Sequence, residues 1–213
     1  MVLLITLAGV VLGCAFAAYA FLAPRQPVLG PDGRGARVLV VEGWLDEPEL
    51  DQAIAAFRGG HYERVVATGG PIENWSEFRV WHSFAERAAD YLRAHGLEAV
   101  AVAAPASAQD RSYLSAVVFR DWARQAGVPL DTVDVYSAGV HARRSWLIYR
   151  MALGEGVQVG VLAARPMEYD PTRWWKTSAG AKTVIGESLS LVWTKCCFWP
   201  APPGSHEERW GSK

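Results

Sequence analysis

Five short apolar runs alternate with segments of helical periodicity, and this alternation constrains the fold more than any other feature of the chain. Short runs rich in valine and alanine are typical of strands that are buried on both faces. The runs are Arg37–Gly43, Arg64–Ala67, Glu98–Ala103, Thr132–Ser137 and Val157–Ala163. Because strands that alternate with helices form right-handed βαβ units, the sequence predicts an α/β fold. We expect a Rossmann-like, doubly wound, mostly parallel sheet of about five strands.

The helices are predicted from the spacing of apolar residues between these runs. Aromatic and alanine residues at helical spacing predict a long helix over residues 78–92. A last helix is predicted from about Lys182 to Phe198. Its apolar stripe consists of Ile185, Leu189, Val192 and Cys196. We expect residues 37–199 to form one domain and residues 200–213 to be a flexible tail.

An uncharged apolar run precedes the domain. Residues 3–23 read LLITLAGVVLGCAFAAYAFLA, and about 20 such residues cross the hydrocarbon core of a bilayer as a helix. We therefore expect residues 1–24 to be a transmembrane anchor and the proline- and glycine-rich residues 25–36 to be a linker. A cleaved signal peptide is an alternative, although no basic region precedes the run. A lipoprotein signal at Cys14 is another, although the apolar run continues past that cysteine.

Composition argues against two classes of function. The net charge is −1 with 20% charged residues, so there is no electrostatic reason to expect a nucleic-acid partner. The cysteines Cys14, Cys196 and Cys197 form no CxxC or Cys/His spacing, so no metal site is predicted. No HExxH or GxSxG motif is present, which removes two standard hydrolase signatures.

In such a fold, ligands bind beyond the carboxyl ends of the strands. Glu42, Gly43 and Trp44 follow the first strand. A carboxylate buried at a strand end costs free energy unless it is paired or functional. Glu42 is therefore a candidate catalytic residue, and a solvated loop position is the alternative.

The second strand ends in Thr68, Gly69 and Gly70. Two glycines let the backbone approach a ligand closely, and free N–H groups at such a turn bind anions. An ordinary tight turn is the alternative, because the sequence has no GxGxxG or Walker A motif. We include these three residues in a candidate ligand site.

The third strand is followed by Asp110, Arg111 and Ser112, which open a helix. Asp110 is a favourable N-cap residue, and this structural role is the alternative to ligand binding. Arg111 and Ser112 lie where the N–H groups of a helix N-terminus are free to bind an anion.

The fourth strand leads into the most informative stretch, with Ser137, Gly139, His141 and Arg144. His141 and Arg144 are three residues apart and share one face of the first helical turn. A helix N-terminus with added histidine and arginine suits phosphate or carboxylate, whereas a cation there opposes the helix dipole. We expect an anion site here, with His141 as a catalytic residue, and a solvated basic turn is the alternative.

Taken together, these segments resemble the YdcF/ElyC/SanA family. The resemblance rests on VVEGW in the first strand, TGGP after the second, DRSY at a helix opening and SAGVHARRS after the fourth. The family's serine and His-x-x-Arg pattern matches Ser137, His141 and Arg144. Ser112 stands at its threonine position, whereas its asparagine position holds Ser115, so one polar contact differs here.

The resemblance covers about residues 37–197, and the glutamate of the family's closing helix would be Glu187. It implies a Rossmann-like domain in the cell envelope and a nucleotide-like or S-adenosylmethionine-like ligand, without an established reaction or a known cofactor. It also implies a domain outside the cytoplasm. Arg25, Arg34 and Arg37 follow the apolar run and predict the opposite side by the positive-inside rule. We expect the outer side.

Two functions fit these residues. One is an enzyme, a hydrolase or transferase, acting on a phosphorylated, lipid-linked or nucleotide-linked envelope precursor. Arg144 and the Gly69 and Gly70 amides would hold phosphate, His141 would be general acid or base, and Glu42 would orient a water or hydroxyl. The other is a non-catalytic binding or scaffold protein that holds an anionic ligand at the same site.

Overall fold

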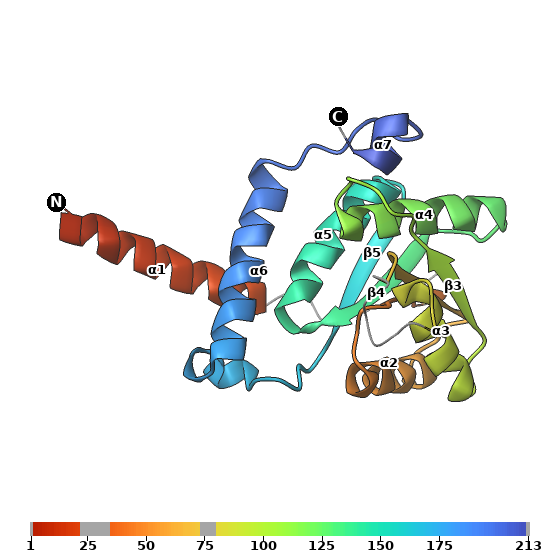
Figure 1. Cartoon of the computed structure of the whole chain (residues 1–213), viewed down its shortest axis with the longest axis horizontal. Coiled ribbons are helices and arrows are strands. Elements are labelled where there is room, and N and C mark those ends of the chain that lie inside the picture. The colour runs from red at the N-terminus through yellow and green to blue at the C-terminus, as the bar shows by residue number, and fades with distance from the viewer. Residues whose placement is uncertain (1, 22–34, 73–79, 212–213) are drawn as a thin grey trace.

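The computed structural model describes residues 2–21, 35–72 and 80–211, with the side chains of the first segment described for residues 4–14. Five parallel strands form one sheet in the order β3-β2-β1-β4-β5 (Figure 1). The strands are β1 (Val38–Glu42), β2 (Arg64–Gly69), β3 (Ala99–Ala103), β4 (Thr132–Ala138) and β5 (Gln158–Ala164). The expected parallel α/β fold is therefore confirmed.

Helices cover both faces of this sheet. The α-helices are α1 (Val2–Phe21), α2 (Glu47–Gly59), α3 (Phe84–Ala94), α4 (Arg111–Gln125), α5 (Ala142–Leu153), α6 (Ser178–Cys196) and α7 (His206–Trp210). The short 3₁₀ helices are η1 (Gly139–His141) and η2 (Pro171–Lys176). The chain winds outward from β1 through α2 and α3, then returns through α4 to the other side of β1.

Alternation along the strands divides the core into two layers. In β1, Val38 and Val40 pack with α4 and α5, whereas Leu39 and Val41 pack with α2 and α3. Each fully buried side chain of this size contributes roughly 1.5–3 kcal/mol to folding. The period of two also places Glu42, the last residue of β1, on the α4 and α5 side of the sheet.

Two predicted helices differ from the observed ones. The helix expected over residues 78–92 begins at Phe84, because Ser83 and Glu86 form a capping box that fixes its start. Residues 78 and 79 of that prediction lie outside the described residues. The last helix begins earlier than expected, at Ser178, where Thr177 accepts a hydrogen bond from the Gly180 amide.

The N-terminal segment forms α1, whose described side chains, residues 4–14, are all exposed. Within the part of the chain that the structure describes, no helix has both the length and the apolarity needed to cross a membrane. The linker expected over residues 25–36 lies almost entirely outside the described residues.

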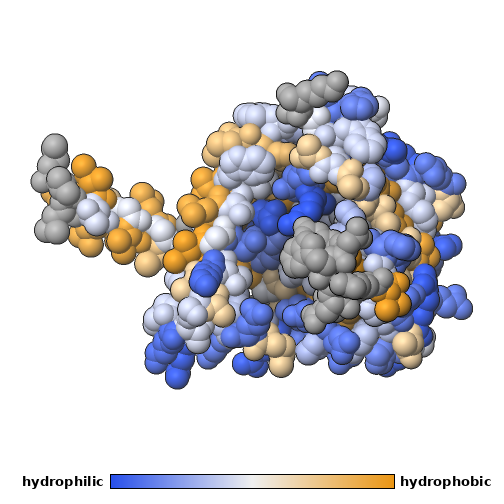
Figure 2. All heavy atoms as spheres, viewed as in Figure 1, coloured by the Kyte–Doolittle hydropathy of each residue, from blue (hydrophilic) through white to orange (hydrophobic). Residues whose placement is uncertain are grey.

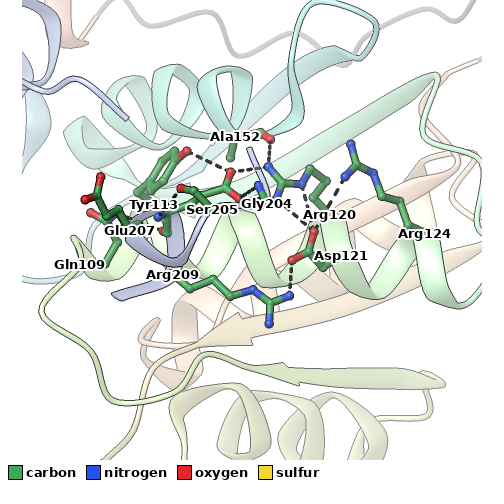
Figure 3. Close-up of polar contacts among 11 residues, drawn as sticks. Gln109, Tyr113, Arg120, Asp121, Arg124, Ala152, Gly204, Ser205, Glu207 and Arg209 are labelled. Carbon is green, nitrogen blue, oxygen red and sulfur yellow. Dashed lines mark hydrogen bonds and ion pairs between the residues drawn. The ribbon is translucent and has the colours of Figure 1, made fainter. Parts of the chain in front are cut away.

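The C-terminal segment is packed on the domain, in contrast to the flexible tail expected from the sequence. Glu208 of α7 is fully buried and accepts two hydrogen bonds from Arg120 of α4, at 2.7 and 2.9 Å (Figure 3). The backbone N–H of Gly204 also donates to this carboxylate. Arg209 pairs with Asp121, which in turn accepts from Arg120. This buried ion-pair network holds the segment on α4.

We expect Glu208→Ala to lower the free energy of unfolding by about 3 kcal/mol, because it leaves the buried Arg120 guanidinium with fewer acceptors. Urea denaturation of both proteins measures this difference. The control is Glu207→Ala, an exposed neighbour that we expect to change stability by less than about 0.5 kcal/mol. Equal free energies of unfolding for the two variants would contradict a stabilising role of the Glu208–Arg120 ion pair.

Candidate functional site

The candidate site lies where the strand order reverses. β1 and β4 are neighbours in the sheet, but the chain leaves β1 toward α2 and leaves β4 toward α5, on opposite faces. A crevice therefore opens at their carboxyl ends, as in other doubly wound folds. A cavity of about 650 Å³ occupies this place, and its lining includes Glu42, His141, Arg144 and Glu187.

Glu42 is a buried carboxylate held by two serines. Ser137 Oγ of β4 donates to one carboxylate oxygen at 2.5 Å, and Ser145 Oγ of α5 donates to the other at 2.9 Å. Both serines are fully buried, and Glu42 itself is only 4% exposed. The carboxylate therefore joins β1, β4 and α5 while one side of it lines the cavity.

His141 lies between two carboxylates. Its Nδ1 is 2.9 Å from Glu187 Oε1, and its Nε2 is 3.8 Å from Glu42 Oε2. The Trp44 ring meets the imidazole edge-on, with the ring centroids 4.9 Å apart. His141 Nε2 is buried and has no hydrogen-bond partner among the residues that the structure describes. An imidazole fixed in this way presents one ring nitrogen for proton transfer.

Glu187 connects α6 to this histidine. Its other oxygen accepts a hydrogen bond of 2.9 Å from Arg144 Nε. Burial raises the pKa of Glu187, but the hydrogen bonds and charges of His141 and Arg144 outweigh that effect and bring it to about 2. Glu187 is therefore ionised at physiological pH, and it compensates the Arg144 charge and accepts from the imidazole.

We expect the stabilising effect of Glu187 to disappear in acid. Because its pKa in the folded protein, about 2, lies below the ordinary 4.5, the ionised carboxylate stabilises the fold fully above pH 4.5. This contribution decreases as the pH falls toward 2. The free energy of unfolding of wild type should exceed that of Glu187→Gln by roughly 2–3 kcal/mol at neutral pH. This difference should shrink as the pH falls from 4.5 to 2. Urea denaturation across this range measures it, and a gap independent of pH would contradict the ion-pair arrangement.

The predicted site contains four glycines, and the three that follow β1 or end and follow β2 have different roles. A Cβ on Gly43 would meet the carbonyl oxygens of Phe84 and Thr68, and one on Gly69 would lie 2.8 Å from Phe84 Cβ. These two glycines therefore allow the start of α3 to pack against β1 and β2. A Cβ on Gly70 would have nothing within 4 Å, and Gly70 lines the cavity. Only Gly70 leaves its backbone open to a ligand.

A second part of the cavity wall is the N-terminus of α4. Asp110 caps this helix through a hydrogen bond from the Tyr113 amide, so its structural role is the one observed. Arg111 and Ser112 line the cavity, and Arg111 is exposed. This wall lies near β2 and β3 and carries a guanidinium group together with the free N–H groups of a helix start.

The opposite wall is acidic. Asp46 and Glu49 come from α2 and Glu168 from the loop after β5. Burial raises the pKa of Glu49, and the nearby charges of Asp46 and Glu168 raise it further. Burial and neighbouring carboxylates, Glu49 foremost, raise the pKa of Tyr169 to about 12, so its hydroxyl stays protonated. That hydroxyl is buried without a hydrogen-bond partner in the described part of the chain.

The structure brings most of the predicted residues to one cavity. The ones that line it are Glu42, Trp44, Thr68, Gly69, Gly70, Arg111, Ser112, Gly139, His141 and Arg144. Gly43, Asp110 and Ser137 are not in that lining, and each supports a lining residue from behind or beside it.

Sequence reasoning from strand ends missed the cavity residues that come from elsewhere. Glu187 was indicated only by the family resemblance, although a lone carboxylate in the apolar run of the last helix is a usable signal. Ser145 is four residues after His141, and a small polar residue on a buried helical face was its signal. Tyr169 and Glu168 follow β5 in an irregular segment, and no local pattern identifies them.

Among the described residues, no group of three or more histidine, cysteine, aspartate and glutamate side chains is arranged to hold a metal ion. No family model matches the chain, and no curated protein or solved structure matches it. The resemblance to the YdcF/ElyC/SanA family therefore stays a prediction.

Proposed function

We propose that this protein binds a phosphorylated, sugar-like or nucleotide-like ligand at the β1/β4 crevice and acts on it as a hydrolase or transferase. The observation that supports this proposal most directly is the environment of His141 Nε2. This atom is a buried ring nitrogen without a partner in the described chain, and it belongs to an imidazole held by Glu187 within a cavity. A purely structural histidine usually has both nitrogens satisfied.

The imidazole is arranged as a general base. If Nδ1–H donates to Glu187, the lone pair is on Nε2, on the side of the ring that faces Glu42. In a hydrolysis, Nε2 would take a proton from water as its oxygen bonds to phosphorus. The bond from phosphorus to the leaving oxygen breaks, and that oxygen then receives the proton from the imidazolium. In a transferase, an acceptor hydroxyl replaces the water.

Glu42 would orient the attacking group. Two serine hydroxyls fix its carboxylate, so its position is determined before a ligand arrives. An acceptor-only carboxylate beside His141 Nε2 is suited to receive a hydrogen bond from the attacking water or hydroxyl. Glu42 acts here as an orienting group, and His141 accepts the proton.

The two walls suggest the ligand's polarity. Arg111 and the start of α4 lie near β3, whereas Glu168 follows β5. β3 and β5 are the two edges of the sheet. Phosphate would bind at the Arg111 end, and hydroxyl or amino groups would donate to the carboxylates of the other end. A sugar phosphate or a nucleotide sugar has both kinds of group.

The proposal has two further parts. Residues 3–23 would tether the protein to a membrane, and the domain would lie outside the cytoplasm and act in cell-envelope biogenesis. The uncharged sequence of this run and the exposed apolar side chains of α1 support the tether. Carbonate extraction of the membrane fraction tests it. We expect the chain to remain in the membrane pellet after extraction, and quantitative release into the supernatant would contradict the tether.

A non-catalytic binding protein is the second candidate. Two hydroxyl groups of the cavity wall are engaged in hydrogen bonds: Thr68 bonds to Tyr149, and Ser115 donates to the Arg111 carbonyl. Ser137, which donates to Glu42, is fully buried. Since these three hydroxyls are engaged or buried, they are poor nucleophiles. This favours either direct attack by water or by an acceptor hydroxyl, or binding without a reaction.

Thermal-shift curves of the full chain in detergent identify the ligand class. The panel contains nucleotides, sugar nucleotides, S-adenosylmethionine, polyprenyl phosphates and inorganic phosphate. A ligand that binds the native state raises the melting temperature. We expect a phosphorylated compound to do so and Arg111→Gln to weaken its binding by roughly 10-fold or more, because a charge-assisted contact is lost.

The bound compound then serves as substrate in a turnover assay. We expect His141→Ala to lower turnover by roughly 10²–10⁴ while binding changes little, because a general base acts in the transition state. His61→Ala, an exposed histidine in a turn, is the control and should retain full activity. Binding without turnover in wild type would support the non-catalytic candidate. No shift with any phosphorylated compound would contradict both.

A further inference from the structure

Helix α6 carries an exposed apolar face on the side opposite to the one that packs on the domain. Its inward face contains Thr183, Val184, Glu187 and Leu191, which pack on the domain or line the cavity. A helix buried on one side is expected to be polar on the other. The opposite side instead carries four large exposed side chains, which we call the outward face of α6: Ile185, Leu189, Val192 and Trp193.

The apolar stripe used to predict the helix, which includes Ile185 and Leu189, points away from the domain rather than into it. Leu189 is 67% exposed. Figure 2 shows the apolar surface of α6 beside that of α1, and the two helices are in contact. A contiguous exposed apolar patch of this kind marks an interaction surface.

The charges around this face have one sign. The charged residues within η2 and α6 are Arg173, Lys176, Lys182, Glu187 and Lys195. The four cations are exposed, whereas Glu187 points inward to His141 and Arg144. Asp170, which caps η2, is the carboxylate nearest to Arg173 in sequence. The outward face therefore combines apolar side chains with a positive border.

We propose that the outward face of α6, together with η2, docks on the surface of a membrane that contains anionic lipids. Apolar side chains would enter the boundary between headgroups and acyl chains, and lysines would reach the lipid phosphates. The exposed Trp175, Trp193 and Trp199 suit this boundary, where indole rings are enriched. A second copy of the chain is a poorer occupant, because a two-fold interface would bring the same cations together.

The docked face also has a consequence for the cavity. Thr183 and Glu187 line the cavity from the other side of the same helix, and the exposed Met167 lies in its lining before η2. Docking of α6 would therefore hold this wall of the cavity close to the bilayer. The docking itself does not depend on the proposed function, since no ligand or reaction enters it.

Spin labelling of the full chain tests the docking. Cys14, Cys196 and Cys197 are replaced by serine, and a nitroxide is attached to Leu189→Cys or, as a control, to Gln125→Cys at the exposed end of α4. The protein is bound to vesicles of phosphatidylcholine with phosphatidylglycerol. We expect the label at 189 to be accessible to oxygen and shielded from a water-soluble nickel relaxant, and the label at 125 to show the reverse.

A variant that lacks two lysines distinguishes docking through charge on the anionic lipids from mere closeness of α6 to the membrane. Each lysine near an anionic surface strengthens the interaction about fivefold, so Lys176→Gln with Lys182→Gln should lower the docked-to-undocked ratio by roughly 25-fold. Circular dichroism and the melting temperature check that both labelled proteins fold. Equal nickel accessibility at 189 and 125 on the anionic vesicles would overturn the proposal. Dipolar broadening at 189 in detergent would also overturn it, in favour of a second copy.

Discussion

The buried carboxylate of Glu42 is the group on which the arrangement of the site depends. It ends the central strand and receives hydrogen bonds from Ser137 at the end of β4 and Ser145 on α5. A carboxylate at 4% exposure would be costly without such donors. By accepting hydrogen bonds from both serines, Glu42 fixes the start of α5 over the crevice and thereby the position of His141. Arg87 of α3 supports the same region by donating to the Gly43 and Leu45 carbonyls.

Much of the fold follows from local pattern, since five valine-rich runs between helical segments have few other arrangements. Where each helix begins, and which of its sides is buried, depends on tertiary contacts that the hydrophobic pattern of the sequence does not reveal. The start of α3 is fixed by the Ser83 and Glu86 capping box, and the C-terminal segment by the ion pair of Glu208 with a residue 88 positions earlier. α6 was correctly expected as a helix, but its most apolar stripe faces away from the domain, so hydrophobicity gives no signal for which side is buried.

The site was predictable where parallel strands bring their ends together, because chain position then implies spatial position. Glu42 ends β1, Gly70, Arg111 and His141 come after β2, β3 and β4, and all four line one cavity. Glu187 comes from a helix after the last strand, so its contact with His141 is purely tertiary. Its effect is nevertheless large, since it accepts from both His141 and Arg144 and has a pKa of about 2.

The central claim is that His141 is held as a base with its lone pair on Nε2. Nitrogen-15 NMR of the histidine rings measures the tautomer directly, with the His141 signals assigned by their loss in His141→Ala. At a pH where the ring is neutral, the account predicts a proton on Nδ1, toward Glu187, and a pyridine-like Nε2. A proton on Nε2, with Nδ1 accepting from Arg144, would contradict it, because the nitrogen toward Glu42 would then have no lone pair to accept a proton.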